Sequence, residues 1–461
     1  MRALASVPCL VALVLAACEP DVTSTAPLQT IDDELRQALA VGGWGGGALP
    51  VGAMASQPEA QVELGRALFF DKILSGNRDV ACATCHQPST ALGDGLSLSI
   101  GTGGTGSGPE RTLGPGREFV PRNAPSLLNV GLGMPYMLWD GRVSGSGFSA
   151  IVAALGTEPS APGAPVMSVG DALVAQAFLP VVDRREMRGE PGDTDVQGRP
   201  NELAAFADME HFQIWAAIMD RLMAIPEYVD MFAAAFPDTP TAQLGYEHAA
   251  RALAVFEMAE FTKARSPFDR YLDGDDDAMT TAQKRGALLF FGDASCSTCH
   301  VGPFLGGQSF DNVGAPQIGP GAATEPPLDL GRGEAKGGAF YRFAFRVPPL
   351  RNVELTAPYM HSGAYPTLEA VVRHYDDVER ALRTYDVTQL DPALRDMHHG
   401  DEGTIDAIME ALGGTLRTPL DHDRGEQDDL VAFLKSLTDP SARDLGHLIP
   451  ARVPSGLSVG R

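Results

Sequence analysis

The chain has 461 residues, of which 44% are hydrophobic and 20% charged, a composition typical of globular proteins and long enough for roughly two or three domains. Its formal net charge of -24 argues against a nucleic-acid partner, because binding to phosphate backbones requires clustered Lys and Arg. The acidity suits a basic protein partner or simply the solubility of an exported protein.

The N-terminal residues predict export from the cytoplasm. An apolar stretch runs through Ala17, and Leu15-Ala16-Ala17-Cys18 is the pattern that precedes the lipidated cysteine of bacterial lipoproteins. We expect residues 1–17 to be a signal peptide and Cys18 to carry a lipid that anchors the protein to a membrane on the periplasmic side. A plain signal peptide cut nearby is the alternative. The glycine-rich stretch 18–58 then predicts a mobile, lipidated tether.

Two short sequences that lie after residue 58 recur later in the chain. The sequence LGRALFF at 64–70 returns as RGALLFF at 285–291, and PSLLNVGLGMPYM at 125–137 returns as PPLRNVELTAPYM at 348–360. Such an internal duplication predicts two modules of one design.

Helix signals dominate the rest of the chain. The segments 202–236 and 243–265 contain few helix breakers and many Ala, Leu, Met and Phe residues, and both are expected to be helical. Leu430, Phe433, Leu434 and Leu437 have the spacing of an amphipathic terminal helix. Strand signals are scarce, and long glycine-rich stretches predict loops. The expected fold is therefore all-α with long irregular loops.

Two CxxCH motifs carry the chemistry of the sequence. In this motif both thiols form thioethers to a haem, and the histidine binds the iron. A zinc site or a redox dithiol would leave the histidine after each cysteine pair unexplained. We expect two covalent haem c groups and two cytochrome c-type domains, at 59–272 and 273–445. Their haems are held by Cys82, Cys85 and His86 and by Cys296, Cys299 and His300.

From about residue 62 to 439 the sequence resembles the bacterial di-haem cytochrome c peroxidase family, in particular its MauG-like branch. The resemblance rests on both CxxCH motifs, RNAP at 122–125, WDGR at 139–142 and TAPYMH at 356–361. It implies a peroxidase that reduces hydrogen peroxide at the N-terminal haem with electrons relayed through the C-terminal haem. The alternatives are a MauG-like oxidase, whose high-valent haem modifies tryptophan in a partner protein, and a pure electron-transfer cytochrome. The implied partners are peroxide and either a small soluble donor, such as cytochrome c or cupredoxin, or a protein substrate.

The resemblance also implies a peroxidatic pocket. The family spacing of Gln, Pro, Glu and Met is reproduced by Gln176, Pro180, Glu186 and Met187. A carboxylate at this position can move a proton from the near to the far peroxide oxygen, so Glu186 is the expected acid/base group and Gln176 positions it. Without the family spacing, Glu186 would simply belong to a solvated charged run. Other members keep a distal His after a Ser-Ile-Gly stretch, and here Thr102 stands there, which implies an open haem at His86.

The remaining implied roles concern the second haem and its surroundings. Counting from His361, the second axial ligand is Tyr375, as in the MauG-like branch, and His374 is the rival one residue away. Met360 and Met397 are expected to be core residues. Trp139 matches a tryptophan between the haems, or is a large core aromatic. Three residues match a calcium site of the family, and Asn123 among them could instead cap a turn. Arg346 matches an arginine near the haem propionates. The three calcium residues are Asn123, Thr356 and Pro358.

Overall fold

A computed structural model describes residues 30–41, 49, 57–145, 172–322 and 325–460. The predicted signal peptide and Cys18 lie outside these residues. The described chain is mostly helical, as expected, and within it no helix has the length and hydropathy needed to cross a membrane. The α-helices of the described residues are α1 (Ile31–Val41), α2 (Glu59–Phe70), α3 (Cys82–Cys85), α5 (Ala172–Gln176), α6 (His211–Met223), α7 (Pro226–Ala235), α8 (Tyr246–Glu260), α9 (Pro267–Leu272), α10 (Thr281–Phe291), α11 (Arg332–Lys336), α12 (Leu368–Asp376), α13 (Val378–Arg383), α14 (Glu402–Glu410) and α15 (Arg424–Ser436).

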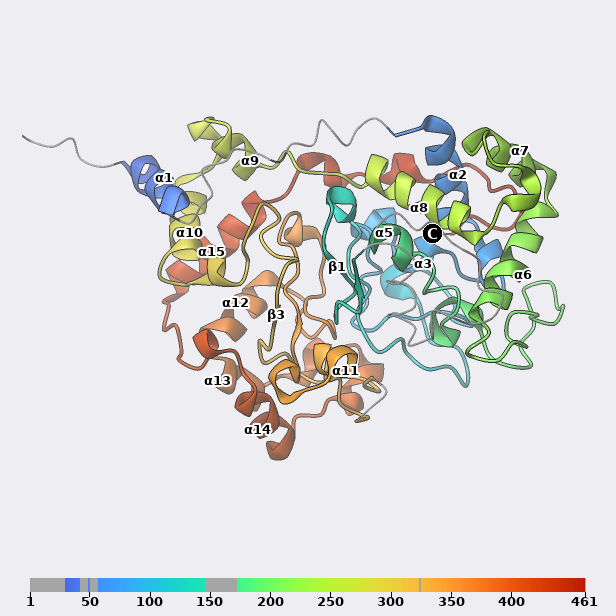
Figure 1. The fold of residues 1–461 in the computed structure, drawn as a ribbon. Coiled ribbons are helices and arrows are strands. Elements are labelled where there is room, and N and C mark those ends of the chain that lie inside the picture. The colour runs from blue at the N-terminus through green and yellow to red at the C-terminus, as the bar shows by residue number, and fades with distance from the viewer. Residues whose placement is uncertain (1–29, 42–48, 50–56, 146–171, 323–324, 461) are drawn as a thin grey trace, which may run out of the picture.

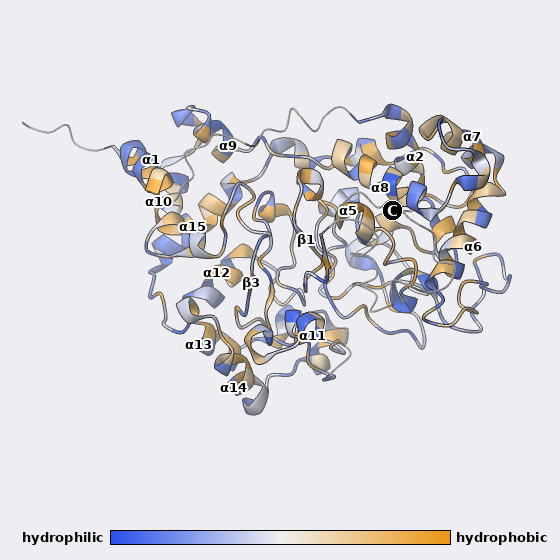
Figure 2. Cartoon of the chain, in the orientation of Figure 1, coloured by the Kyte–Doolittle hydropathy of each residue, from blue (hydrophilic) through white to orange (hydrophobic). Residues whose placement is uncertain are grey.

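The helices form two groups with irregular chain between them. Helices α2 and α5 to α8 lie on one side, and α1, α10 and α12 to α15 on the other (Figure 1). Two short antiparallel ribbons lie in the irregular part. One pairs β1 (Tyr136–Met137) with β2 (Val143–Ser144), and the other pairs β3 (Phe310–Asp311) with β4 (Phe345–Arg346). Helices of both groups carry hydrophobic and hydrophilic stretches, as amphipathic helices do (Figure 2).

Each duplicated glycine lies where two helices cross closely. A Cβ added to Gly65 on α2 would lie 2.0 Å from the carbonyl oxygen of Ala252 on α8. A Cβ on Gly286 of α10 would lie 1.8 Å from the carbonyl oxygen of Asp429 on α15. Only a residue without a side chain permits such an approach, so the repeated glycine is explained by the same helix crossing in both halves.

The second duplicated sequence forms the junction between the halves. Asn129 and Asn352 occupy equivalent positions in it, and both have left-handed backbone, with φ of 65° and 64°. Their side-chain amides donate to the same acceptor, the carbonyl oxygen of Lys263, at 3.0 and 2.8 Å. The two repeats therefore meet on the connection that follows α8.

The apolar core is divided in a way that crosses the predicted domain boundaries. The largest cluster is built from residues between Val62 and Phe261, and Ala442, Leu448 and Val453 from the end of the chain also join it. A second cluster includes side chains from α9, α10 and α15. Leu430, Phe433, Leu434 and Leu437 are buried in it, so the predicted amphipathic terminal helix is confirmed.

The prediction of a mobile tether over 18–58 is wrong for Ile31–Val41. This segment forms α1, whose Leu35 and Leu39 are buried in the second cluster. An ion pair of 2.7 Å between Asp32 and Lys284 also joins α1 to α10. Low sequence complexity around the segment concealed its amphipathic pattern.

The predicted helix over 202–236 is wrong for 202–210 and is interrupted before Pro226. Asn201 Oδ1 accepts hydrogen bonds from the amides of Leu203 and Ala204, and carbonyls of this stretch accept from arginines elsewhere in the chain. These tertiary hydrogen bonds replace the helical ones. The helix predicted over 243–265 is present as α8 but covers only Tyr246–Glu260.

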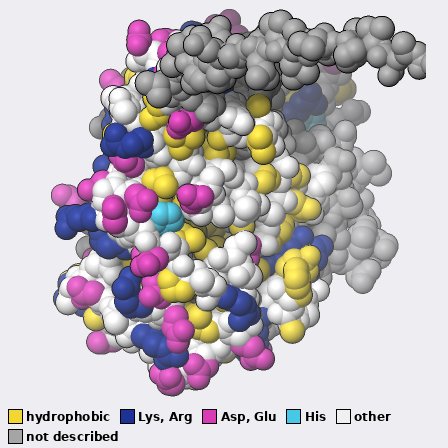
Figure 3. Space-filling view, turned by 90° about the vertical axis from the view of Figure 1, so that its left-hand side faces the viewer, with side chains coloured by type: hydrophobic (Ala, Val, Ile, Leu, Met, Phe, Trp, Pro, Cys, Tyr) yellow, Lys and Arg dark blue, Asp and Glu magenta, His cyan; other side chains and the backbone are white. Residues whose placement is uncertain are grey.

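Acidic and basic side chains are interspersed on the face of the molecule drawn in Figure 3. The negative charge of the chain is accordingly mixed with positive charge there, which suits a soluble surface.

Candidate functional site

Both CxxCH motifs line one cavity of about 1030 Å³, and residues from both halves of the chain surround it. The structure thus brings together residues that lie far apart in the sequence. The predicted site residues that line this cavity are Cys82, Cys85, His86, Asn123, Trp139, Gln176, Pro180, Glu186, Cys296, Cys299, His300, Arg346, Thr356, Pro358 and Tyr375.

The two motif histidines are held in the same way. His86 Nδ1 lies 3.0 Å from the carbonyl oxygen of Leu92, and His300 Nδ1 lies 2.8 Å from that of Leu305. Both leucines have left-handed backbone. Because a carbonyl can only accept, each Nδ1 carries the proton and each Nε2 keeps a lone pair for a metal. Burial lowers the pKa of both imidazoles to about 4, so both are neutral, as iron ligation requires.

The cysteines and Arg346 also suit covalently bound haem. Cys82, Cys85, Cys296 and Cys299 line the cavity and form no disulfide with one another. The guanidinium of Arg346 is buried and donates to the carbonyl oxygen of Leu138, and within the described chain no carboxylate forms an ion pair with it. Burial lowers its pKa to about 10. A buried cation without a counter-ion fits the negative propionates of a haem.

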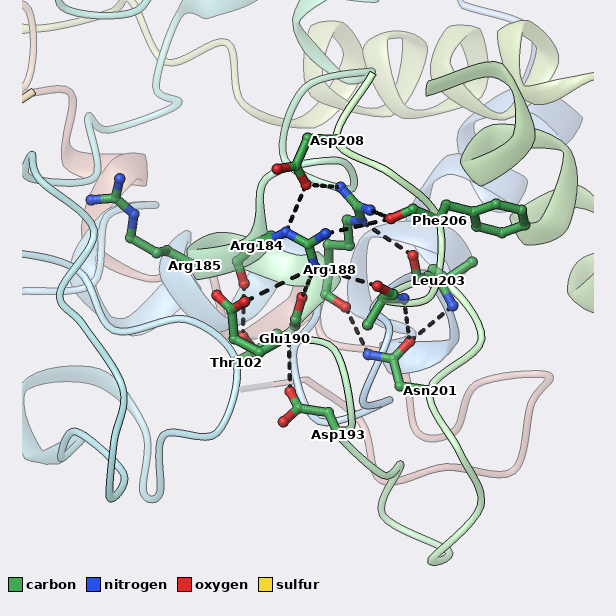
Figure 4. Close-up of polar contacts among 12 residues, drawn as sticks. Thr102, Arg184, Arg185, Arg188, Glu190, Asp193, Asn201, Leu203, Phe206 and Asp208 are labelled. Carbon is green, nitrogen blue, oxygen red and sulfur yellow. Dashed lines mark hydrogen bonds and ion pairs between the residues drawn. The ribbon is translucent and has the colours of Figure 1, made fainter. Parts of the chain in front are cut away.

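Glu186 lies in the short turn Arg184–Arg188, which is fixed from several sides (Figure 4). Asp183 Oδ1 accepts from the Glu186 amide at 3.1 Å, and Thr102 Oγ1 donates to the Arg184 carbonyl at 3.1 Å. Arg188 is fully buried and donates to the Leu203 carbonyl at 3.1 Å and to Asp208 at 3.0 Å. The carboxyl group of Glu186 is therefore presented to the cavity from a rigid turn.

The surroundings of Glu186 make its carboxyl group a weak acid. Burial raises its pKa to about 8, and the negative charge of Asp183 acts in the same direction, whereas Arg142 and Arg185 act in the opposite direction. A group with such a pKa can both accept and donate a proton near neutral pH. Gln176 ends α5 and lines the same cavity, but no hydrogen bond joins it to Glu186.

Thr102 is turned away from the cavity. Its hydroxyl is bonded to the Arg184 carbonyl, and it is not among the cavity-lining residues. Gly101 beside it allows this packing, because an added Cβ would lie 2.0 Å from the Arg185 carbonyl oxygen. Thr102 therefore supports the Glu186 turn.

Tyr375 and His374, the two candidates on α12 for the second axial ligand, face different surroundings. Tyr375 lines the cavity, and burial raises the pKa of its phenol. His374 instead uses both ring nitrogens in hydrogen bonds, to the Val313 carbonyl at 2.8 Å and to the Tyr365 hydroxyl at 2.9 Å. Met397 packs in an apolar cluster, as expected of a core residue, whereas Met360 packs there and also lines the cavity.

Trp139 and the residues expected to bind calcium lie in adjoining loops. Trp139 Nε1 donates to the Asn123 carbonyl at 2.9 Å, and Asn123 Nδ2 donates to the Leu96 carbonyl at 2.6 Å. The Asn123 side-chain amide thus joins its loop to that of Leu96.

Glu257 and His361 are among the ionisable residues of the cavity wall that sequence reasoning missed. Glu257 is 5% exposed, its Oε2 has no hydrogen-bond partner among the described residues, and burial raises its pKa to about 8. His361 is buried, its ring stacks on Phe345 at 3.6 Å, and burial lowers its pKa to about 4. A single acid within the apolar run 254–259 was the available signal for Glu257. His361 served only as a reference point for counting.

Comparisons with known proteins identify the family. A model of the family described as di-haem cytochrome c peroxidase matches residues 59–277. The methylamine utilization protein MauG of Methylorubrum extorquens is 31% identical over 317 residues, which are 68% of this chain and 68% of that protein. Cytochrome c551 peroxidase of Pseudomonas aeruginosa is 33% identical over 305 residues, which are 66% of this chain and 68% of that protein.

Solved structures share the fold. A MauG-like protein associated with microbial copper homeostasis has a TM-score of 0.58 and 26% identity, covering 87% of this chain and 95% of that one. The diheme peroxidase BthA from Burkholderia thailandensis has a TM-score of 0.54 and 21% identity, covering 88% of this chain and 91% of that one. From its motifs, its cavity and these relatives, the chain belongs to the di-haem cytochrome c peroxidase family, oxidoreductases with two c-type haems that act on peroxide.

Proposed function

We propose that this protein reduces hydrogen peroxide at the haem held by Cys82, Cys85 and His86. The observation that carries the proposal is the position of Glu186, whose carboxyl group lines the same cavity as His86 and has a pKa near neutrality. A cavity carboxyl group with a raised pKa is a candidate for proton transfer, and Glu186 is distinguished from Glu257, which shares both properties, by its family spacing from Gln176 and Pro180.

Glu186 would move one proton during cleavage of the peroxide bond. Its carboxylate would accept a proton from one oxygen of the peroxide and return it to the other, which would leave as water. Gln176 and Pro180 line the cavity beside it and would hold the peroxide in place. The bound haem supplies the electrons for this cleavage. Thr102, whose hydroxyl is bonded to the Arg184 carbonyl, would supply no ligand to the haem held by Cys82, Cys85 and His86.

The haem at Cys296, Cys299 and His300 would relay electrons to this site. Tyr375 is proposed as its second axial ligand, since it faces the cavity while His374 is engaged on both nitrogens. Arg346 would neutralise a haem propionate. Trp139 would lie between the haems, where its ring can carry charge. A small soluble redox protein, cytochrome c or cupredoxin, would be the donor.

A second candidate function is that of a MauG-like oxidase that modifies tryptophan in a partner protein. Tyr375 and the similarity to MauG favour it. A pure electron carrier is less well supported, because Glu186 and the turned-away Thr102 serve no purpose at an iron with two ligands.

Other features complete the proposal. The halves at 59–272 and 273–445 would be the two cytochrome c domains. Asn123, Thr356 and Pro358 would provide oxygen ligands for calcium. The protein would act on the periplasmic side of a membrane, anchored through lipidated Cys18.

Replacing Glu186 tests the proposal. Glu186→Gln keeps the shape of the side chain but removes its base, and should slow the peroxide-dependent change in the haem spectrum by ~10²–10⁴-fold. The control is Glu190→Gln, an exposed carboxylate close in sequence, which should react at the wild-type rate. Both variants should retain two haems in a pyridine haemochrome assay. A wild-type rate in Glu186→Gln would refute the assigned role.

A further inference from the structure

A row of aromatic rings leads from Tyr375 away from the cavity toward the surface. The ring centroid of His374 lies 5.6 Å from that of Tyr375, and the centroid of Tyr365 lies 5.3 Å from that of His374. The ring of Tyr385 follows at 5.6 Å, and that of His398 at 4.8 Å. Exposure rises along the row, from buried His374 and Tyr365 to half-buried Tyr385 and His398.

The hydrogen bonds of His374 prepare Tyr365 for oxidation. His374 Nε2 faces the Val313 carbonyl, which can only accept, so Nε2 carries the proton and Nδ1 is an acceptor. The Tyr365 hydroxyl, 2.9 Å from Nδ1, therefore donates to it. A tyrosine loses an electron readily only when its phenolic proton has somewhere to go, and Nδ1 of His374 is in contact with that proton.

The outer end of the row is accessible. A second cavity of about 450 Å³ is lined by Tyr365, His374 and Tyr385, together with Arg373 and other polar side chains. Val371, Val372 and Tyr375 of α12 line the main cavity, whereas Ala370, Arg373 and His374 line this one, so different faces of α12 border the two cavities. A row built only for packing would not need to connect the wall of one cavity with the wall of another.

We propose that Tyr385 and Tyr365 form an electron-entry path that delivers electrons from an external one-electron donor to the Tyr375 end of the main cavity. The path rests on the proposed function, because hydrogen peroxide is the oxidant that draws the electrons inward. Tyr365 gives one electron toward Tyr375 and its proton to Nδ1 of His374. Tyr385, which lines the second cavity, then returns an electron to Tyr365 and releases its own phenolic proton to water there, while the proton on His374 moves back to Tyr365. An electron from the donor and a proton from water restore Tyr385. Two such passages supply the two electrons that convert one peroxide, with two protons, into two waters.

The test follows the oxidising equivalent in the absence of a donor. The mature protein with both haems is mixed with hydrogen peroxide in the presence of a nitroso spin trap, and the labelled residues are mapped by peptide mass spectrometry. Freeze-quenched samples without the trap are examined by electron paramagnetic resonance. Wild type should give a tyrosyl radical signal and carry the label on Tyr385.

The decisive variant is Tyr365→Phe, which keeps the ring but removes the hydroxyl. It should still show the peroxide-dependent change in the haem spectrum, yet lose the label on Tyr385, although Tyr385 itself is unchanged. Tyr385→Phe should keep a radical on Tyr365. The control is Tyr341→Phe, which removes a tyrosine outside the row and should leave labelling of Tyr385 at the wild-type level.

The outcomes separate this inference from the proposed function. Unchanged labelling of Tyr385 in Tyr365→Phe would overturn the path, as would a wild-type spectral change without label on either tyrosine. A wild-type protein whose haem spectrum does not respond to peroxide would overturn the proposed function, and the path with it.

Discussion

Glu257 offers a sharp test of the electrostatics of the cavity, because its carboxyl group is buried without a partner for Oε2 among the described residues. Burial alone raises its pKa from the ordinary value of 4.5 to about 8. The folded protein therefore holds a proton on Glu257 over a pH range in which the unfolded chain releases it. Glu257→Gln replaces the acid by a neutral group of nearly the same shape.

The sign and size of the effect follow from linkage. A folded-state pKa above the unfolded value favours folding fully below pH 4.5, and this advantage is lost as pH rises toward 8. Between the unfolded-state pKa of 4.5 and pH 7 lie about 2.5 pH units. At ~1.4 kcal/mol per unit, the free energy of unfolding is therefore roughly 3 kcal/mol lower at pH 7 than it is when Glu257 is protonated in both states. Glu257→Gln does not ionise, so it should raise the free energy of unfolding by about 3 kcal/mol at pH 7 and by less than about 1 kcal/mol at pH 5.

Denaturant unfolding of the mature protein at several pH values measures this difference. The control is Glu260→Gln on the same helix, whose half-buried carboxylate pairs with Arg66. It should cost at most about 1 kcal/mol, without the pH dependence expected for Glu257→Gln. If the difference between Glu257→Gln and wild type stayed constant from pH 5 to pH 7, the carboxyl group would not be buried in the way described.

Two further changes test how the site is held. Arg188→Met should lower the free energy of unfolding by about 2–4 kcal/mol, because it leaves the Leu203 and Phe206 carbonyls without their buried donor; the less buried Arg184→Met should cost less in the same denaturation assay. Gly286→Ala should cost about 1–3 kcal/mol by forcing α10 away from α15, whereas Gly414→Ala, where an added Cβ meets nothing within 4 Å, should change thermal unfolding little.

The sequence was most informative where chemistry depends on neighbouring residues. A CxxCH motif places three haem-binding groups on one short turn, so His86 and His300 could be assigned from the motif alone. Gln176 and Glu186 could be paired because one short segment carries both, with family spacing between them. Residues of this kind all line the main cavity.

The sequence was least informative where distant segments decide the outcome. The stretch 202–210 has helical composition, yet Arg184 and Arg188 of the Glu186 turn donate hydrogen bonds to its carbonyl oxygens. Helix α1 lies in a region of low complexity and is held by its packing on α10. Glu257 became a cavity residue only because α8 packs beside the first CxxCH motif, which no local pattern indicates.

The pH dependence of the peroxide reaction tests the central proposal most directly. If Glu186 accepts a proton from peroxide, its deprotonated form is the active one, and a pKa of about 8 leaves that form scarce at pH 6. The rate constant for the peroxide-dependent change in the haem spectrum, followed by stopped-flow mixing, should therefore rise about tenfold per pH unit below pH 8 and level off above it. In Glu186→Gln the rate should be low and should lose this rise. A wild-type rate that is flat between pH 6 and 9, or the same rise in Glu186→Gln, would contradict the role of Glu186 as the proton acceptor.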